Sequence, residues 1–184
     1  ALAAEIGVMV GESLSALGEP QRGEATLRAA VARARVALGP RHPLTVQGRA
    51  LLAESLSVQR PEEARALADA RVLDALAGLP ATAGAAVFAL RMQSFQLAKL
   101  DEAERSIEVL RRAVQVAETH LGPLHDETLV SLGLLSNTLG RFRRFGEQLA
   151  VAGDAMGRAQ QSLGAARPHV TLTAVERWYG EALR

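Results

Sequence analysis

Apolar residues in this chain recur at intervals of three and four, the spacing that places side chains on one face of an α-helix. The first such segment runs from Leu2 to Leu17. Its apolar positions, which we expect to line one helical face, are Ile6, Val10, Leu14 and Leu17. A second segment, Glu24 to Leu38, carries the stripe Leu27, Val31 and Ala34. Gly18-Glu19-Pro20 separates the two segments, so the pattern predicts a helix, a turn and a second helix.

The same pattern of a helix, a break and a further helix continues along the chain. The further helices are expected at Leu44–Val58, Glu62–Gly78, Thr82 or Ala85 to Lys99, Asp101–His120, Asp126 or Glu127 to Gly140, Phe145–Leu163 and His169–Arg184. Asp101 is a candidate N-cap, because its carboxylate can accept an otherwise unpaired amide of the first turn. β-Branched residues are sparse and strong helix formers dominate. The sequence therefore predicts an all-α protein with nine helices.

A turn motif returns at a nearly constant spacing. Leu38-Gly39-Pro40-Arg41-His42-Pro43 is followed by Leu79-Pro80, by Leu121-Gly122-Pro123-Leu124-His125-Asp126 and by Leu163-Gly164, with leading leucines 41, 42 and 42 residues apart. A fixed period near forty is the signature of stacked structural repeats. We expect one domain, 1–184, of four units at about 2–40, 41–80, 81–123 and 124–165, with a terminal helix at 168–184.

Small residues occupy equivalent positions on the successive first helices. They are Gly11, Ala53, Ser136 and Gly180, while the register of the third unit is ambiguous by one residue. Only 3% of the residues are aromatic. We therefore expect paired helices to approach closely along seams of small side chains.

These motifs resemble the tetratricopeptide repeat (TPR) superfamily, in the 42-residue variant found in kinesin light chains and many bacterial regulatory proteins. Leu38 to Pro43 matches the Leu-Gly-x-x-His-Pro leader of that variant, Leu52-Ala53 with Leu56 matches its first helix, and Glu63-Ala64 opens its second helix. The leader at Leu121 is similar, with Asp126 in place of proline. The resemblance implies an α-α superhelix, a right-handed solenoid of about four helix pairs plus a terminal helix.

In the superfamily the first helices line a concave groove that binds peptides, often through paired Asn side chains. Here Ala50-Leu51 and Gly133-Leu134 stand at those positions, which argues against recognition of the kinesin type. One residue after the small position the chain carries Glu12, Glu54, Asn137 and Glu181. With Arg49 these are the expected partner-binding residues, and the acidic row would suit a basic peptide. The alternative is that the glutamates are ordinary solvated helix residues.

Charge and composition narrow the functional classes. The 21 basic and 20 acidic residues are interspersed and give a net charge of +1, so no field of one sign attracts nucleic acid or anionic lipid. Glu5 and Glu12 interrupt the first apolar run, which fits neither a signal peptide nor a membrane span. All basic residues except Lys99 are arginine, a bias that we associate with bacteria. We expect a cytoplasmic protein, of which this sequence is a segment.

The candidates for chemistry are the four histidines, because the chain has no cysteine. His42, His125 and His169 belong to different turns, about 10 Å apart per helix layer, so they cannot converge on one metal. His120 and His125 with Asp126 make only a weak zinc motif, and the leader histidines are expected to bond turn carbonyls or to cap the next helix. No phosphate loop or nucleophile elbow is present. We therefore expect no enzyme, metal or cofactor; an enzyme using His120 and His125 is the alternative.

Two aromatic clusters complete the candidates. Arg141-Phe142-Arg143-Arg144-Phe145 could contact nucleic acid or an acidic peptide, but we interpret it as a turn between helices with Phe145 in the core. Trp178-Tyr179 either caps the last repeat or awaits a further helix, in which case the segment would form a homodimer through its terminal helix. The expected function is a scaffold or regulatory module that holds a protein or peptide. A peptide-sensing domain of a bacterial transcription regulator or signalling kinase is the alternative.

Overall fold

The computed structural model describes residues 2–56, 60, 63, 64, 67, 83–163 and 180. Over these residues the chain forms helices and turns only, which confirms the all-α prediction. The helices are α1 (Leu2–Ala16), α2 (Pro20–Leu38), α3 (Pro43–Leu56), α6 (Ala83–Lys99), α7 (Ala103–His120), α8 (Asp126–Arg141) and α9 (Phe145–Leu163). The helices predicted at Glu62–Gly78 and His169–Arg184 fall almost entirely outside the described residues, as does the suggested dimer contact.

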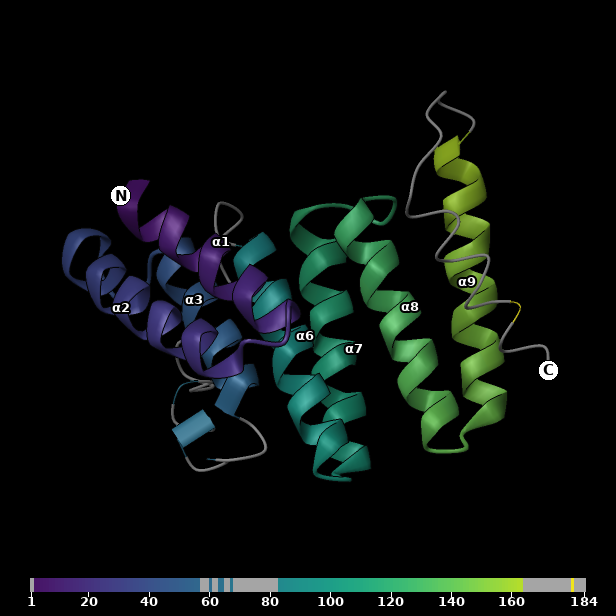
Figure 1. Ribbon diagram of the computed structural model, residues 1–184. Coiled ribbons are helices and arrows are strands. Elements are labelled where there is room, and N and C mark those ends of the chain that lie inside the picture. The colour runs from purple at the N-terminus through teal and green to yellow at the C-terminus, as the bar shows by residue number, and fades with distance from the viewer. Residues whose placement is uncertain are drawn as a thin grey trace.

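The helices stack in one direction, each on the next, as Figure 1 shows. Their buried apolar residues form three clusters instead of one central core. One lies among α1, α2 and α3, the next among α3, α6 and α7, and the last among α7, α8 and α9. Each cluster shares a helix with its neighbour, so every unit covers the apolar face of the unit beside it.

The recurring Leu-Gly motif forms the same capping turn before α3 and before α8. Gly39 and Gly122 adopt φ of 93° and 108°, a left-handed region that glycine enters without steric cost. Their carbonyls accept the hydroxyls of Thr45 at 2.9 Å and Thr128 at 2.7 Å. This equivalence gives the spacing of the two motifs a structural cause, because α2 and α7 stop, and α3 and α8 begin, with the same geometry.

Close contacts between positions twelve residues apart, at least one of them small, hold the two helices of a unit together. On α1 and α2, a Cβ added at Gly23 would lie 2.9 Å from the carbonyl oxygen of Gly11. On α6 and α7, the hydroxyls of Ser94 and Ser106 lie 2.9 Å apart. On α8 and α9, Ser136 donates to the Gln148 carbonyl at 3.3 Å. The expected close seams are present at Gly11 and Ser136, and Ser94 resolves the ambiguous register of the third unit.

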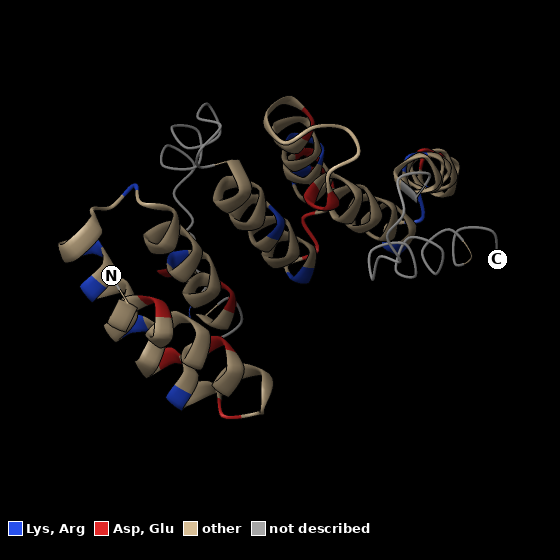
Figure 2. Ribbon diagram, turned by 90° about the horizontal axis from the view of Figure 1, so that it is seen from above, with Lys and Arg blue, Asp and Glu red and all other residues tan. Residues whose placement is uncertain are grey.

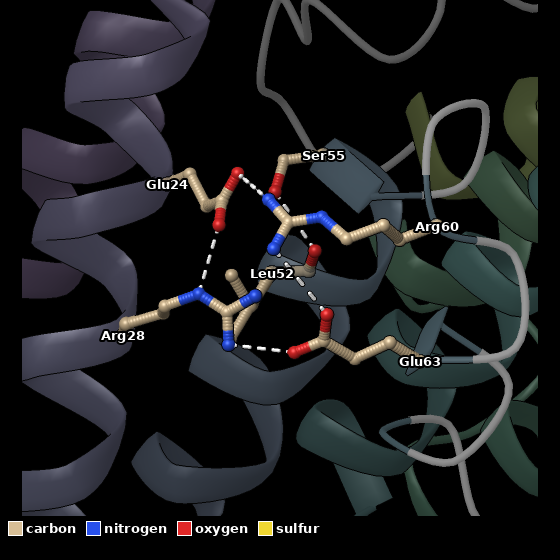
Figure 3. Close-up of polar contacts among 6 residues, drawn as sticks. All are labelled: Glu24, Arg28, Leu52, Ser55, Arg60 and Glu63. Atoms are coloured by element: carbon tan, nitrogen blue, oxygen red, sulfur yellow. Dashed lines mark hydrogen bonds and ion pairs between the residues drawn. The ribbon is translucent and has the colours of Figure 1, made fainter.

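Ion pairs join the second helices of neighbouring units. Figure 3 shows Arg28 of α2 between Glu24 and Glu63, at 2.8 and 2.6 Å, with Arg60 closing the ring. The hydrogen bond from Arg28 lowers the pKa of both carboxyls, Glu24 and Glu63. An equivalent rung recurs further on, where Arg111 of α7 lies 2.6 Å from Glu147 of α9.

The face of α1 that packs is not the one expected. Ala4, Val8 and Gly11 are its buried residues, whereas Ile6 is 50% exposed and Leu17 is 78% exposed. Val10 is also exposed and Leu14 is half-buried. The reason is positional: Gly48, the residue of α3 equivalent to Ile6, faces Val31 of the preceding α2. No described helix occupies the corresponding place beside α1.

Two helix starts also differ from the prediction. Pro20 is the first residue of α2 and not part of the break. Proline is favourable there because amides in the first turn have no acceptor within the helix, so the lack of an N–H group costs no hydrogen bond. Asp101 is not an N-cap: it adopts φ of 60° in the turn, and Glu102 precedes the first residue of α7 without a side-chain cap. The turn after α6 is therefore longer than predicted, because α7 begins at Ala103 and not at Asp101.

Candidate functional site

A groove follows the first helices α1, α3, α6 and α8. Its first part is a cavity of about 490 Å³ bounded by α1, α2, α3 and α6. Among the residues that line it are Glu12, Leu51, Glu54, Phe88, Met92 and Lys99. Glu12 and Glu54 project into this cavity from equivalent positions of α1 and α3, one residue after the small residue of each seam.

The second part is a cavity of about 400 Å³ bounded by α3, α6, α7 and α8. Among its lining residues are Glu54, Arg91, Met92, Phe95, Asn137 and Arg141. Glu54 and Met92 line both cavities, so the two are adjoining parts of one depression. We call this depression the first-helix groove.

The structure brings together three of the five residues predicted to bind a partner. Glu12 and Glu54 line the first cavity, and Glu54 and Asn137 line the second. Arg49 lies half-buried on α3 and lines neither cavity. Glu181 lies outside the described residues. The predicted row is therefore a real spatial feature of α1, α3 and α8.

Phe95 is the groove residue that the sequence did not reveal. Because the seam of the third unit lies at Ser94, Phe95 stands one residue past it, equivalent to Glu12, Glu54 and Asn137. Its side chain is 45% exposed although it is large and apolar. The ambiguous register hid it, and the twelve-residue spacing from Ser94 to Ser106 was the signal that could have placed it.

Arg91 stands at the wall of the second cavity. Its side chain is 11% exposed, and its Nη1 donates to the Glu127 carboxylate of α8 at 2.6 Å. The guanidinium lies 6.0 Å from the centre of the Phe88 ring, and its Nε is buried without a hydrogen-bond partner. The pair fixes α6 against α8 and so shapes the floor of the groove.

Two further cations reach the groove in more exposed positions. Lys99 Nζ lies 4.5 Å from the centre of the Phe95 ring, a cation–π contact. Arg141 lies 5.7 Å from the Phe142 ring at the end of α8. Figure 2 shows acidic and basic residues distributed along the whole array. The predicted acidic row is therefore accompanied by basic side chains, because Arg91, Lys99 and Arg141 also line the groove.

The leader histidines act as helix caps. His42 Nδ1 accepts the amide of Leu44 at 3.2 Å, and His125 Nδ1 accepts the amide of Glu127 at 3.1 Å. Both rings are exposed and belong to separate turns. Among the described residues, no group of three or more His, Asp or Glu side chains is placed to hold a metal ion. His169 lies outside these residues.

The arginine-rich segment after α8 is a turn whose side chains have separate roles. Arg144 bonds the carboxylates of Glu147 at 2.6 Å and Glu104 at 2.9 Å, and the Glu147 bond raises its pKa. Phe142 packs against the last apolar cluster. Phe145, expected in the core, is 59% exposed at the start of α9, because Phe142 occupies the packed side of the turn.

Helix pairs stacked through shared apolar clusters, repeated capping turns and a groove along the first helices define an α-solenoid built from tandem helix hairpins. Comparison with solved structures names the type: the chain has the TPR-like repeat fold. It is similar to two crystal structures of a Podosopora anserina protein described as a kinesin light chain with nearly identical TPR-like repeats.

The fit to these structures is close in shape and distant in sequence. The TM-scores are 0.72 and 0.66, the identities 15% and 14%, and each alignment covers 97% of this chain and 84% of the other. The sequence matches no protein-family model and no curated protein. Within the described part of the chain, no helix combines the length and apolar character that a membrane crossing requires.

Proposed function

We propose that this domain is a protein-interaction module that holds an extended segment of a partner protein, or a peptide, in the first-helix groove. The observation that carries the proposal is the exposed Phe95 in a depression lined by Met92, Leu134 and Ala98. A half-exposed aromatic ring beside polar groups is typical of a binding surface, where a ligand buries the ring.

The shape of the groove also favours binding over catalysis. Its two cavities total several hundred Å³ but are open, and together they extend along the four first helices α1, α3, α6 and α8. A peptide that follows them contacts every first helix in turn. The groove is lined by apolar side chains, carboxylates, cations and the amide of Asn137, which are groups that can bind a peptide.

A selection from random peptides tests this proposal. A phage-displayed library of random dodecapeptides is panned against the purified domain, and selected peptides are synthesised with a fluorescent label for anisotropy titration. Asn137→Trp fills the second cavity, so we expect it to weaken binding at least tenfold. Gln115→Trp adds the same ring at an exposed position of α7 outside both cavities and serves as the control.

The outcomes separate clearly. Peptides that bind the parent domain and the Gln115→Trp variant equally, and the Asn137→Trp variant weakly, support a binding groove. A selection that enriches no peptide, or peptides that bind all three proteins equally, would overturn the proposal. Circular dichroism of each variant verifies that the helices are retained.

A further inference from the structure

The charges along the first-helix groove are segregated by helix. Among the described lining residues, the acids Glu12 and Glu54 come from α1 and α3, and the bases Arg91, Lys99 and Arg141 come from α6 and α8. The groove thus changes sign along its length, although the whole chain carries a net charge of only +1.

The residues at the two ends are accessible to a ligand. Glu12 on α1 and Arg141 on α8 are both exposed. Lys99 of α6 is exposed, lines the first cavity together with Glu12 and Glu54, and lies over the Phe95 ring. Arg91 is different, since it is nearly buried and its charge is partly balanced by Glu127. The acidic end therefore centres on Glu12 and the basic end on Arg141.

An apolar stretch separates the two ends. Met92 lines both cavities, and Phe95 and Leu134 line the second. Apart from Lys99 in the first cavity, the order from Glu12 to Arg141 is therefore acidic, apolar and basic. A ligand complementary to it carries the opposite order, and a uniformly basic ligand would bring cations close to Lys99 and Arg141.

We propose that the groove selects an extended segment that is bipolar: a basic residue over α1 and α3, an apolar residue against Met92 and Phe95, and an acidic residue near Arg141. This inference rests on the proposed function and specifies its ligand. Neighbouring helices lie about 8–10 Å apart, so the groove spans roughly 25 Å from α1 to α8. An extended chain advances about 3.3 Å per residue, which places the two charges about six to eight positions apart.

Charge inversion of the groove tests the proposal for either direction in which the peptide can run. A peptide selected by the library serves as host. Its flanks are replaced to give four labelled peptides that carry Arg then Glu, Glu then Arg, Arg at both ends, or Glu at both ends. Each is titrated against the parent domain and against the double variant Glu12→Arg with Arg141→Glu.

We expect the parent domain to prefer one of the two bipolar peptides, by about threefold to tenfold over the other three, since exposed charge pairs are individually weak. The double variant should prefer the bipolar peptide of the opposite order. The control double variant Glu5→Arg with Arg33→Glu changes the same charges at exposed positions outside the cavities, and it should keep the parental preference.

Other results have distinct meanings. If the peptide with Arg at both ends binds most tightly, or if inversion leaves the order preference unchanged, the bipolar inference is wrong while the binding groove stands. If all four peptides bind the parent domain equally, charge does not contribute and the inference is likewise overturned. A library that yields no host peptide refutes the proposed function itself.

Discussion

The contact between α1 and α2 offers a quantitative test of the packing that places Glu12 in the groove. A Cβ at Gly23 would lie 2.2 Å from Ser15 Oγ, 2.9 Å from the Gly11 carbonyl oxygen and 3.0 Å from the Ser15 amide nitrogen. The Ser15 hydroxyl can rotate away from its bond to Gly11, but the two backbone atoms cannot. Gly23→Ala must therefore move α1 away by about half an ångström, because ordinary contacts begin near 3.4 Å.

Two opposing energies decide the outcome. Replacing glycine by alanine within a helix is worth about 0.5–1 kcal/mol of stability. Overpacking costs about 1–3 kcal/mol, so the net loss lies between about 0 and 2.5 kcal/mol, with a midpoint of about 1 kcal/mol. Gly157→Ala in α9 is the matched control, because nothing lies within 4 Å of its added Cβ. It should gain the propensity term alone, and the difference between the two variants isolates the overpacking cost.

The assay is urea unfolding followed by circular dichroism, with the slope of each transition compared, since a change in slope would show that the repeats no longer unfold together. Gly23→Ala should lower the midpoint and Gly157→Ala should raise it. If Gly23→Ala stabilises the domain as much as the control does, α1 and α2 are not as close as described. The position of Glu12 relative to Glu54 would then be wrong as well.

Three further predictions concern the caps, the ion pairs and the groove. His125→Ala should cost about 0.5–2 kcal/mol of unfolding free energy because the Glu127 amide loses its acceptor, and urea titration should show His125→Asn to be milder. The hydrogen bond from Arg28 lowers the pKa of Glu24, so the ionised carboxylate stabilises the folded state above its ordinary pKa of about 4.3. This stabilisation is lost as the pH falls and the carboxylate is protonated. Between pH 7 and pH 3 the melting temperature should therefore fall less for Glu24→Gln than for the parent domain. Phe95→Ala should lower the affinity for a selected peptide roughly tenfold in an anisotropy titration. The melting temperature should not change, since the ring is 45% exposed. A large fall in melting temperature would instead make Phe95 a core residue.

The repeat period and the helix-forming composition were sufficient to predict the fold. The Leu-Gly turns at residues 39 and 122 need a backbone that favours glycine, so the sequence records them directly. The face of α1 could not be predicted, because Ile6 and Val10 satisfy the helical spacing as well as Ala4 and Val8 do. Which face is buried depends on the helices beside α1, and small residues pack there in place of large ones.

The site was predictable only in part, for a similar reason. Glu12, Glu54 and Asn137 follow from counting one residue past a small seam position. Phe95 requires knowing that Ser94, and not its neighbour, forms the seam, which the hydrogen bond to Ser106 decides. Lys99 and Arg141 were not predicted to line the groove, because each lies one turn further along its helix than the predicted row.

Site-specific photo-crosslinking can show whether a partner is held along the first helices. p-Benzoylphenylalanine is placed at Phe95 in the groove, or at Val36 of α2, which is 89% exposed and lines neither cavity. Each protein is irradiated with a labelled peptide from the library selection. We expect a crosslink from position 95 and none from position 36. A crosslink from position 36 alone, or equal yields from both, would contradict a partner held along the first helices.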